Sequence, residues 1–277
     1  MFTKELHQAI EKAREKFYSS GIVDTNVVRK DIAESWQRSK SFGVNPYNIE
    51  KKVISKEELE NRIQKRKLYY DIALHSMEGL YNFVKGSNFM LILTDEEGFL
   101  LKVIGDKDIV SIAKKNLLVE GSNRSEKALG TNAIGTCLYI KRPIQVWGAE
   151  HYYSKHSNWV CSAAPIIGDD GTLLGSLCLT GTWDKVHIHT LGIVVAATEA
   201  ISKQIKLQEA YNKLYETNNH LNIMIEYLKF GVILVNSKGT ISKVNSLASS
   251  ILKLHKNEIE NQKISDFIKV IDFSKLS

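Results

Sequence analysis

The sequence predicts an α+β protein in which helices flank a mainly antiparallel sheet, and three observations lead to this class. Apolar residues recur at helical spacing over residues 1–83, starting with Leu6 and Ile10. From Asn88 onward, short apolar runs are separated by turn residues, which is the pattern of antiparallel strands. A long helical pattern then returns beyond Trp183. Helices and strands that are segregated along the chain are typical of the α+β class.

The N-terminal residues are expected to form amphipathic helices that need a partner surface. Gly21 ends the first helical pattern, and a second helix that carries Trp36 follows it. Ser55, with Glu58 three residues later, has the spacing of a capping box. The third helix is predicted to run from there toward Leu80.

The central residues are expected to form the sheet. The predicted elements are a hairpin over 88–95 and 99–105, a helix over 132–140, a strand over 143–147, and a hairpin over 160–167 and 173–180. Near the end of the chain, another hairpin over 230–245 and a short helix over 246–254 indicate a second, smaller fold unit.

The long helical pattern contains a seam of the kind found in two-stranded coiled coils. Its residues follow one another at alternating steps of four and three: Ile193, Ala197, Ala200, Gln204, Leu207, Tyr211, Leu214, Asn218, Leu221, Ile225 and Leu228. Asn218 is the kind of polar seam residue that fixes register. We therefore expect a homodimer that forms through the helix over residues 187–228. Upstream of Gln204 the seam residues are small, so packing against the sheet of the same chain remains an alternative there.

Composition is that of an ordinary soluble globular protein, with 43% hydrophobic and 25% charged residues. The net charge is +6, but basic residues alternate with glutamates, which indicates solvated helix surface rather than a nucleic-acid track. Three widely spaced cysteines are typical of reduced thiols. No apolar run of about 18 residues and no secretory signal pattern occurs. A cytoplasmic location without membrane contact is expected.

The most unusual side chains gather between Gly130 and Gly181, where polar and aromatic residues lie between apolar runs. This pattern predicts a concave binding pocket on a sheet. Indole rings supply flat apolar walls, and histidines exchange hydrogen bonds with carbonyl or hydroxyl groups near neutral pH. The residues expected to line the site are Trp147, His151, His156, Trp159 and Cys161, with Asn132 and Thr180 as second choices.

No catalytic residue, metal site or cofactor is predicted. The segment has neither a nucleophile beside its base nor a phosphate-binding loop. A metal site of His151, His156, Glu150 and Cys161 is disfavoured, since structural zinc sites use tighter spacings. For either histidine alone, a structural role remains an equal alternative, with His151 capping a helix and His156 bound to a backbone carbonyl.

Three motifs carry a resemblance to a known family. They are VRKDIAESWQRSKSFGV at 28–44, SEKALGTNAIGTCL at 125–138, and the series PIQVWGAEHY, HSNWVCSAAPI and GTLLGSLCLTG between 143 and 181. Together they resemble the N-terminal sensory region of the acetoin-catabolism and dihydroxyacetone regulators, which belong to the sigma-54-dependent transcriptional activators. The resemblance covers roughly residues 28–210.

The resemblance implies a domain division and a function. The division is an N-terminal helical segment (1–75), a GAF sensory domain (76–205), a coiled-coil signalling helix (206–228) and a partial PAS-like domain (229–277). It also implies a small-molecule effector, with sigma-54 RNA polymerase and DNA contacted only through an ATPase and a DNA-binding module. The sequence contains no GxxxxGK[ST] motif and no identifiable helix-turn-helix, so we expect both modules to be missing from this chain.

One position departs from the family pattern. Members usually carry a tryptophan just before the Ser-Glu of the second motif, where this chain has Arg124. The effector pocket is therefore expected to be smaller, wetter or differently charged.

Two other functions remain open on the sequence. The first is a protein-interaction platform without a small ligand, because the resemblance includes dihydroxyacetone-type regulators that take their input from partner kinase subunits. The second is a thiol redox enzyme similar to the GAF-type free methionine sulfoxide reductases, using Cys161 and Cys178. Both thiols lie in apolar runs, where burial makes a thiol inert, so enzymatic activity is not expected.

Overall fold

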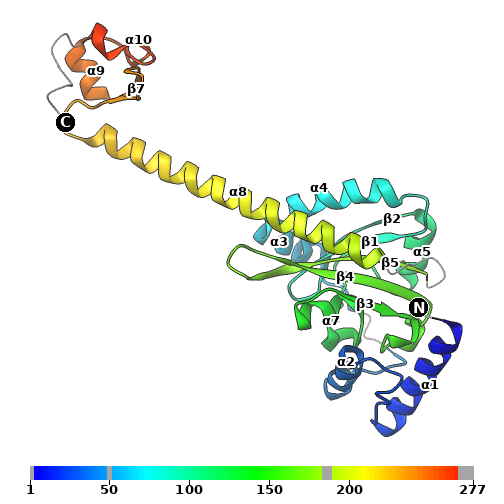
Figure 1. Cartoon of the computed structure of the whole chain (residues 1–277). Helices are drawn as coiled ribbons and strands as arrows, with labels where there is room; N and C mark the ends of the chain where they lie inside the picture. Colours follow the sequence, from blue (N-terminus) through cyan, green and yellow to red (C-terminus); the bar gives the residue numbers. More distant parts are fainter. Residues whose placement is uncertain (1–2, 49–51, 183–188, 268–277) are drawn as a thin grey trace. The chain divides into compact units, whose positions relative to one another are not determined.

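The computed structural model describes residues 3–48, 52–182 and 189–267 (Figure 1). Its internal contacts divide the chain into two units, Met1–Leu207 and Gln208–Ser277. In the first unit, helices cover both faces of an antiparallel sheet. The predicted α+β class is therefore confirmed.

The sheet of the first unit has five strands in the described residues, in the order β2-β1-β5-β4-β3, and every neighbouring pair is antiparallel. The strands are β1 (Met90–Asp95), β2 (Leu100–Gly105), β3 (Ile144–Trp147), β4 (Trp159–Ile167) and β5 (Leu173–Thr182). Both predicted hairpins of this region are present, β1 with β2 and β4 with β5.

Alternating side chains of the strands supply two separate cores. Met90 and Ile92 of β1 join the core on one face, whereas Leu91 and Leu93 join the core on the other. This follows from the two-residue repeat of a strand, whose successive side chains point to opposite faces. The helices flanking the sheet in Figure 1 therefore pack on apolar side chains from both directions.

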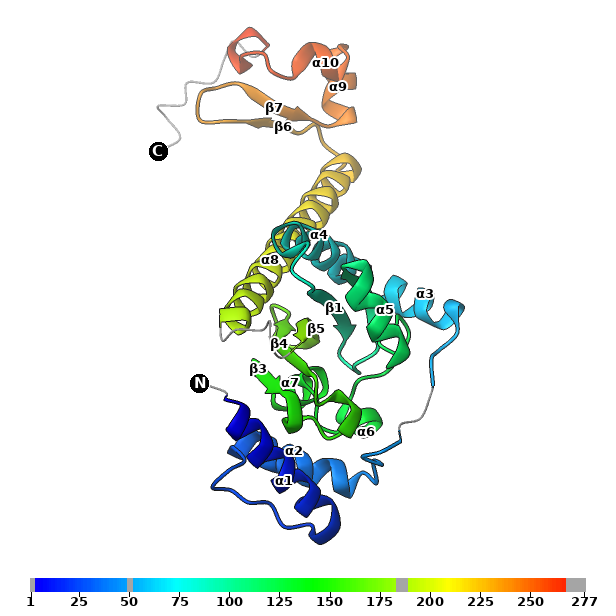
Figure 2. The same ribbon diagram turned by 90° about the vertical axis from the view of Figure 1, so that its right-hand side faces the viewer.

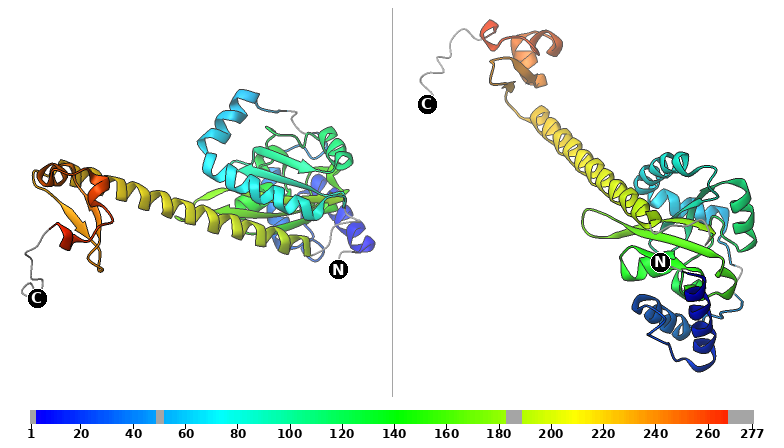
Figure 3. Two further views of the ribbon diagram at one scale, coloured as in Figure 1. Left: turned by 90° about the horizontal axis from the view of Figure 1, so that it is seen from above. Right: turned by 45° about the vertical axis from the view of Figure 1, so that its right-hand side comes forward.

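The helices of the first unit lie on both sides of this sheet. They are α1 (Lys4–Ser20), α2 (Lys30–Ser41), α3 (Lys56–Lys65), α4 (Lys67–Val84), α5 (Lys107–Lys115), α6 (Glu126–Leu129) and α7 (Ala133–Ile140), with 3-10 turns η1 (Gly148–Glu150) and η2 (Ser154–His156). Buried residues of α1, α2, α5 and α7 share one core, and those of α4 share the other with the long helix α8 (His189–Tyr227). Figure 3 shows α4 and α8 over the same face of the sheet.

The third predicted helix begins where the sequence indicates but does not continue to Leu80 as one element. Ser55 caps α3 by accepting a hydrogen bond from the backbone N–H of Glu58. At Arg66 the backbone leaves the helical region, with φ −124° and ψ 31°, and α4 starts at the next residue. The break redirects the chain so that α4 can bury Tyr69 and Met77 against the sheet, while α3 buries no residue.

The face of α8 that packs on the sheet is different from the face that carries the seam residues. Its buried residues are Thr190, Val194, Thr198, Ile201 and Ile205. Ile193, Ala200 and Gln204 of the seam are exposed, whereas Ala197 is partly buried against the core, so the alternative that the upstream seam packs on the sheet holds only for Ala197. The buried face carries Val194, Ile201 and Ile205, each one position along the chain from an exposed seam residue. Residues 187 and 188 of the predicted helix lie outside the described residues.

The second unit has a small core of its own. It contains β6 (Ile233–Val235), β7 (Ile241–Val244), α9 (Ser246–Leu252), α10 (Lys256–Ile259) and the 3-10 turn η3 (Ile264–Asp266). The predicted hairpin and the following helix are present, and Asn245 caps α9. The core consists of Ile241, Val244, Ala248 and Ile259. Its assignment as a PAS-like domain stays a prediction. In the described parts of the chain, no helix is both long and apolar enough to cross a membrane.

Figure 2 shows α1 and α2 beside the part of the first unit that contains β3, α6 and α7. Hydrogen bonds join these two helices to that part. Trp36 of α2 is fully buried, stacks on Phe17 of α1 at 5.7 Å between ring centroids, and donates its Nε1–H to the carbonyl of Glu150. Arg29, at the start of α2, binds both carboxylate oxygens of Glu150 at 2.7 Å. Trp36 is thus a packing residue, not part of an exposed partner surface.

The strongest contact between α2 and α6 is centred on Glu126, which is 4% exposed. Arg38 donates to its two carboxylate oxygens at 2.7 and 2.9 Å, and the hydroxyls of Ser35 and Thr136 donate to Oε1. A buried carboxylate is tolerated only when it is paired and hydrogen-bonded, and here both conditions hold.

We predict that Glu126→Ala lowers the free energy of unfolding by about 3–5 kcal/mol, because it leaves the Arg38 cation, whose side chain is 17% exposed, and two buried hydroxyls without their acceptor. Urea denaturation measures the change. The control is Lys56→Met, which removes an exposed pair with Glu60 and should cost at most about 1 kcal/mol. A loss below about 1 kcal/mol for Glu126→Ala would contradict this assignment.

Candidate functional site

An interior cavity lies between the sheet and the segments that cover its α7 face. Its volume is about 20 Å³, which is enough for roughly one water molecule. Three adjacent strands supply the floor, because Ile92 pairs with Cys178 and Cys161 pairs with Thr180 in the strand register. Residues with the same parity point to the same face, so these side chains converge under the cavity.

The covering segments supply the rest of the lining. Arg124 lies in the loop before α6, and Leu129 is the last residue of that helix. His151 directly follows η1, and His156 is the last residue of η2. Arg14 of α1 fixes the backbone near these histidines, because it donates to the carbonyl of His151 at 3.2 Å and to Ser157 Oγ at 2.9 Å.

Six of the seven residues predicted to form the site line this one cavity: Asn132, His151, His156, Trp159, Cys161 and Thr180. Trp147 does not line it. Its Nε1–H donates to Gln145 Oε1 at 2.7 Å, and its backbone N–H donates to Glu150 Oε2. A role of these residues in ligand binding stays a prediction.

Asn132 has a structural role at the edge of the cavity. Its Oδ1 accepts from the backbone N–H of Gly135 and caps α7, as is usual for this residue type. Its Nδ2 donates to the carbonyls of Arg124 at 2.9 Å and Gly130 at 2.8 Å. The cap therefore also holds the backbone of Arg124 in place.

The two histidines differ in their hydrogen bonding. His151 Nδ1 lies 3.0 Å from the carbonyl of Gly148, which fixes the proton on Nδ1 when the ring is neutral. His156 Nε2 is buried and has no hydrogen-bond partner among the described residues. Burial lowers the pKa of His156 well below its usual value, and the nearby His151 and Arg124 act in the same direction. His156 is therefore neutral at pH 7 and available to a ligand.

The two thiols of the cavity floor form a coupled pair. A hydrogen bond from Cys178 lowers the pKa of Cys161, and His151 reinforces this effect. Burial raises the pKa of Cys178, and its hydrogen bond to Cys161 adds to that rise. Cys137, buried in α7, likewise has its pKa raised by burial. Cys161 is thus the most acidic of the three thiols. Among the described residues, no group of three or more His, Cys, Asp or Glu side chains is arranged to hold a metal ion.

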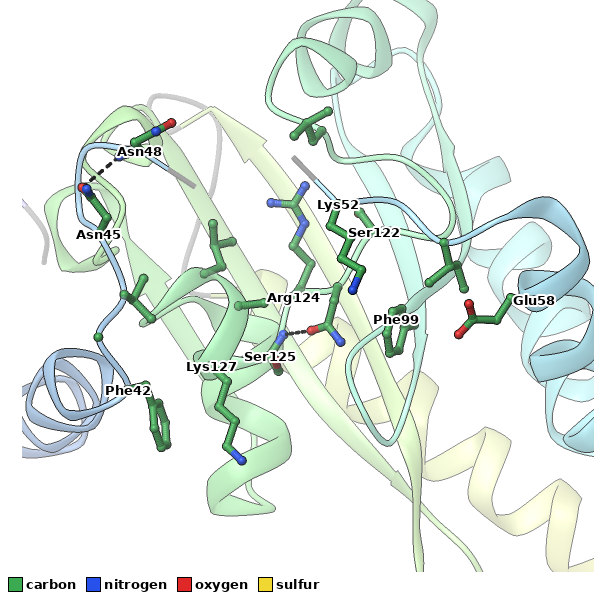
Figure 4. Close-up of a pocket in the computed structure, with 17 residues that line it drawn as sticks. Phe42, Asn45, Asn48, Lys52, Glu58, Phe99, Ser122, Arg124, Ser125 and Lys127 are labelled. Carbon is green, nitrogen blue, oxygen red and sulfur yellow. Dashed lines mark hydrogen bonds between the residues drawn. The ribbon is translucent and has the colours of Figure 1, made fainter. Parts of the chain in front are cut away.

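A larger open cleft of about 690 Å³ adjoins the cavity (Figure 4). It lies between the segment after α2, which includes Phe42 and Asn45, and the segment that includes Asn123 of the preceding loop and Lys127 of α6. Figure 4 shows Arg124 among the lining residues, with Lys52 and Lys127 on either side. Arg124 and Leu129 line both the cleft and the interior cavity, so they form the wall between the two.

Sequence reasoning missed several of these residues. Cys178 was assigned only to a thiol enzyme, and Leu118, Leu129 and the cleft were not anticipated. Arg124 did carry a signal, because it replaces the tryptophan of the resembling family. That its side chain points inward depends on the path of the 117–125 loop, which no local pattern specifies.

We predict that the rate at which iodoacetamide labels Cys161 in the native protein rises with pH and then levels off. It should level off at a lower pH than for an ordinary thiol, whose pKa is about 8.5, because the pKa of Cys161 is lowered. Mass spectrometry of labelled peptides measures the rate at each pH. Cys161→Ser should remove this label, and Cys137 should stay unlabelled because it is buried. A Cys161 rate that keeps rising through pH 9 would contradict the assigned direction.

Comparison with known proteins identifies residues 7–202 as a match to the family described as MimR, N-terminal domain. The chain is 35% identical over 234 residues to a signal-transduction and transcriptional-control protein of Clostridium beijerinckii, covering 84% of this chain and 37% of that protein. It is 36% identical over 201 residues to AcoR, the acetoin dehydrogenase operon transcriptional activator of Bacillus subtilis, covering 72% and 33%. The chain thus spans about a third of the length of these curated relatives.

The fold is similar to that in the crystal structure of the E. coli DhaR(N)-DhaL complex, with a TM-score of 0.79 at 17% identity over 89% of this chain and 84% of that chain. The resemblance to acetoin and dihydroxyacetone regulators inferred from the three motifs is confirmed at the level of the family. The chain therefore belongs to the family of the MimR N-terminal domain.

Proposed function

We propose that this chain is the sensory region of a cytoplasmic, sigma-54-dependent transcriptional regulator. A small metabolite binds in the interior cavity of a GAF-type domain, and the bound state is relayed through α8 of a homodimer to an ATPase module that the 277 residues do not contain. The relatives support a regulatory role, since AcoR is described as an operon activator. A sensory role without chemistry also fits a family whose relatives are transcriptional regulators.

One observation carries the proposal, namely two polar atoms buried beside a cavity whose lining is mostly apolar. These atoms are Arg124 Nε and His156 Nε2, and neither has a hydrogen-bond partner in the described part of the chain. Buried polar groups in native proteins are normally satisfied, and an exception calls for a ligand, a water or a functional reason. Together with apolar walls such as Trp159, this lining is typical of a small-molecule site.

A chain of hydrogen bonds supports the relay from the cavity to α8. His151 directly follows Glu150, whose Oε2 accepts from the backbone of Trp147. Trp147 donates to Gln145, and Gln145 Nε2 donates to Thr190 Oγ1 at 2.9 Å in the first turn of α8. A ligand that favours one position of the His151 segment would thereby favour one position of the helix start.

The exposed seam of α8 supports a dimer. Leu207, Leu214 and Leu221 are 72%, 68% and 53% exposed in the single chain. Apolar side chains repeated at heptad spacing gain stability when a second helix covers them, at about 25 cal/mol per Å² buried. Because another face of α8 packs on the sheet, this seam is available to a second copy.

We predict that at least one short ketone, diol, aldehyde or hydroxy acid raises the melting temperature of the protein. A ligand present at about 100 times its dissociation constant should add about 2.7 kcal/mol, or about 5–10 °C. Differential scanning fluorimetry across the panel measures the shift. Thr180→Val, which alters the cavity floor, should reduce it, whereas the matched Thr172→Val in an exposed turn should not.

A protein-interaction platform is the second candidate, and the small cavity volume favours it. The structural neighbour is itself described as a complex of DhaR(N) with DhaL. If no compound of the panel shifts the melting temperature and a DhaL-type kinase subunit co-sediments with the protein, the platform replaces the metabolite sensor.

We predict that the protein sediments as a dimer and that Leu214→Lys raises the dimer dissociation constant about tenfold or more, since it places a charge in an apolar seam. Sedimentation velocity over a concentration series measures the constant. Glu216→Lys, two residues away and off the seam, is the control and should leave it within about twofold. A wild-type monomer at tens of micromolar would refute the dimer.

A further inference from the structure

Arg124 differs from the other arginines described in the first unit in its charge pairing. The equally buried Arg14 lies 3.7 and 3.8 Å from carboxylate oxygens of Glu11 and Glu15. The partly exposed Arg29, Arg38 and Arg62 each form an ion pair with a buried carboxylate at 2.7–2.8 Å. Arg124 is 3% exposed, yet its guanidinium has no carboxylate within ion-pair distance among the described residues. Its one hydrogen bond there runs from Nη2 to the carbonyl of Asn116 at 3.0 Å, and Nε has no partner.

A buried cation without a counter-ion is costly, and two responses are open to it. The first is loss of its proton, but burial lowers the pKa of Arg124 only to about 10, so it stays charged at pH 7. The second is an anion supplied from outside the chain. The acids that act on Arg124 electrostatically are Tyr153 and Cys161, the thiol whose pKa is lowered, and neither is a carboxyl group. In its described part, the structure thus offers Arg124 no carboxylate.

The residues around Arg124 add a hydrogen-bond donor and positive charge to a binding site for an anion. His156 lines the same cavity, is neutral, and has an unpartnered Nε2 that donates a hydrogen bond in its Nε2–H tautomer. On the cleft side, Lys52 and Lys127 are cationic, and Glu58 is the acidic residue that lines the cleft. The electrostatic balance along the path to Arg124 therefore favours negative charge.

The two volumes limit where the anion lies. The cavity of about 20 Å³ holds roughly one water, so it cannot enclose a whole organic acid. Arg124 also lines the open cleft of about 690 Å³, so a carboxylate can meet Arg124 at the wall between the two while its carbon chain lies in the cleft.

We propose that the effector of this protein is a small monocarboxylate of two to four carbon atoms, whose carboxylate pairs with Arg124 while His156 donates a hydrogen bond to it. The planar guanidinium matches a carboxylate with two parallel N–H···O bonds, a geometry that neutral ketones and diols do not offer. This inference rests on the proposed sensory function, and it assigns the ligand class of the same cavity.

Calorimetric titration of the full chain with matched acid and neutral pairs tests the proposal. The acids are acetate, pyruvate and lactate, and their neutral counterparts are acetamide, hydroxyacetone and propane-1,2-diol. At least one acid should bind, and its neutral counterpart should bind at least about tenfold more weakly. Arg124→Met should weaken the acid about 30-fold or more, because it removes one partner of a buried charge pair.

Two further variants keep the test decisive. Lys127→Met removes a cation of the cleft but not of the cavity, and it should change the acid's dissociation constant less than about twofold. His156→Phe leaves Arg124 in place and should weaken the acid about fivefold or more, which serves as the readout if Arg124→Met does not fold.

The outcomes separate this inference from the proposed function. Equal binding of an acid and its neutral counterpart, or unchanged acid binding by Arg124→Met, overturns the carboxylate assignment. Binding of neutral compounds with silent acids overturns it too, but retains the metabolite sensor. If no acid and no neutral compound binds, both proposals fall.

Discussion

Two buried carboxylates of the covering segments, each held by an arginine of the second helix, are the contacts on which the arrangement around the cavity depends. Glu150 is bound by Arg29 and Glu126 by Arg38, in both cases through two oxygens. Removing one member of such a pair leaves an uncompensated charge in a low dielectric, which is strongly destabilising. Each pair therefore favours the arrangement in which the second helix contacts the covering segments. The N-terminal helices therefore belong to the sensory unit mechanically, because they fix the segments that carry Arg124, His151 and His156.

The same segments lead to the long helix. Trp147 and Gln145 connect the Glu150 turn to Thr190 by hydrogen bonds, and Thr190 begins the face of α8 that packs on the sheet. Packing on the sheet and pairing with a second helix would use separate faces of α8, since the seam residues Leu207 and Leu214 remain exposed. A helix that is bound to the sensor on one face and offers a seam on another is suited to carry a change of packing from one end to the other.

Much of the fold could be predicted because its signals are local. Short apolar runs bounded by turn residues indicate β1 and β5, and side-chain caps such as Ser55 and Asn132 mark helix starts, since both depend only on the order of residues along the chain. The break at Arg66 could not be predicted, because it is imposed by packing of Tyr69 and Met77 on the sheet. For the same reason, the sequence left open which face of α8 meets the sheet upstream of Gln204.

The sequence by itself determined the class of fold, the hairpins, the helix with its seam, and a set of polar and aromatic residues that cluster in the chain between Asn132 and Thr180. Only the tertiary structure decided that Trp147 turns away to Gln145, that Glu126 is the buried hub of the α2 contact, and that Arg124 is buried without a carboxylate among the described residues. Periodicity reports which face of an element is apolar. Charge pairing depends on which distant segments meet, and that is fixed only when the whole core is packed.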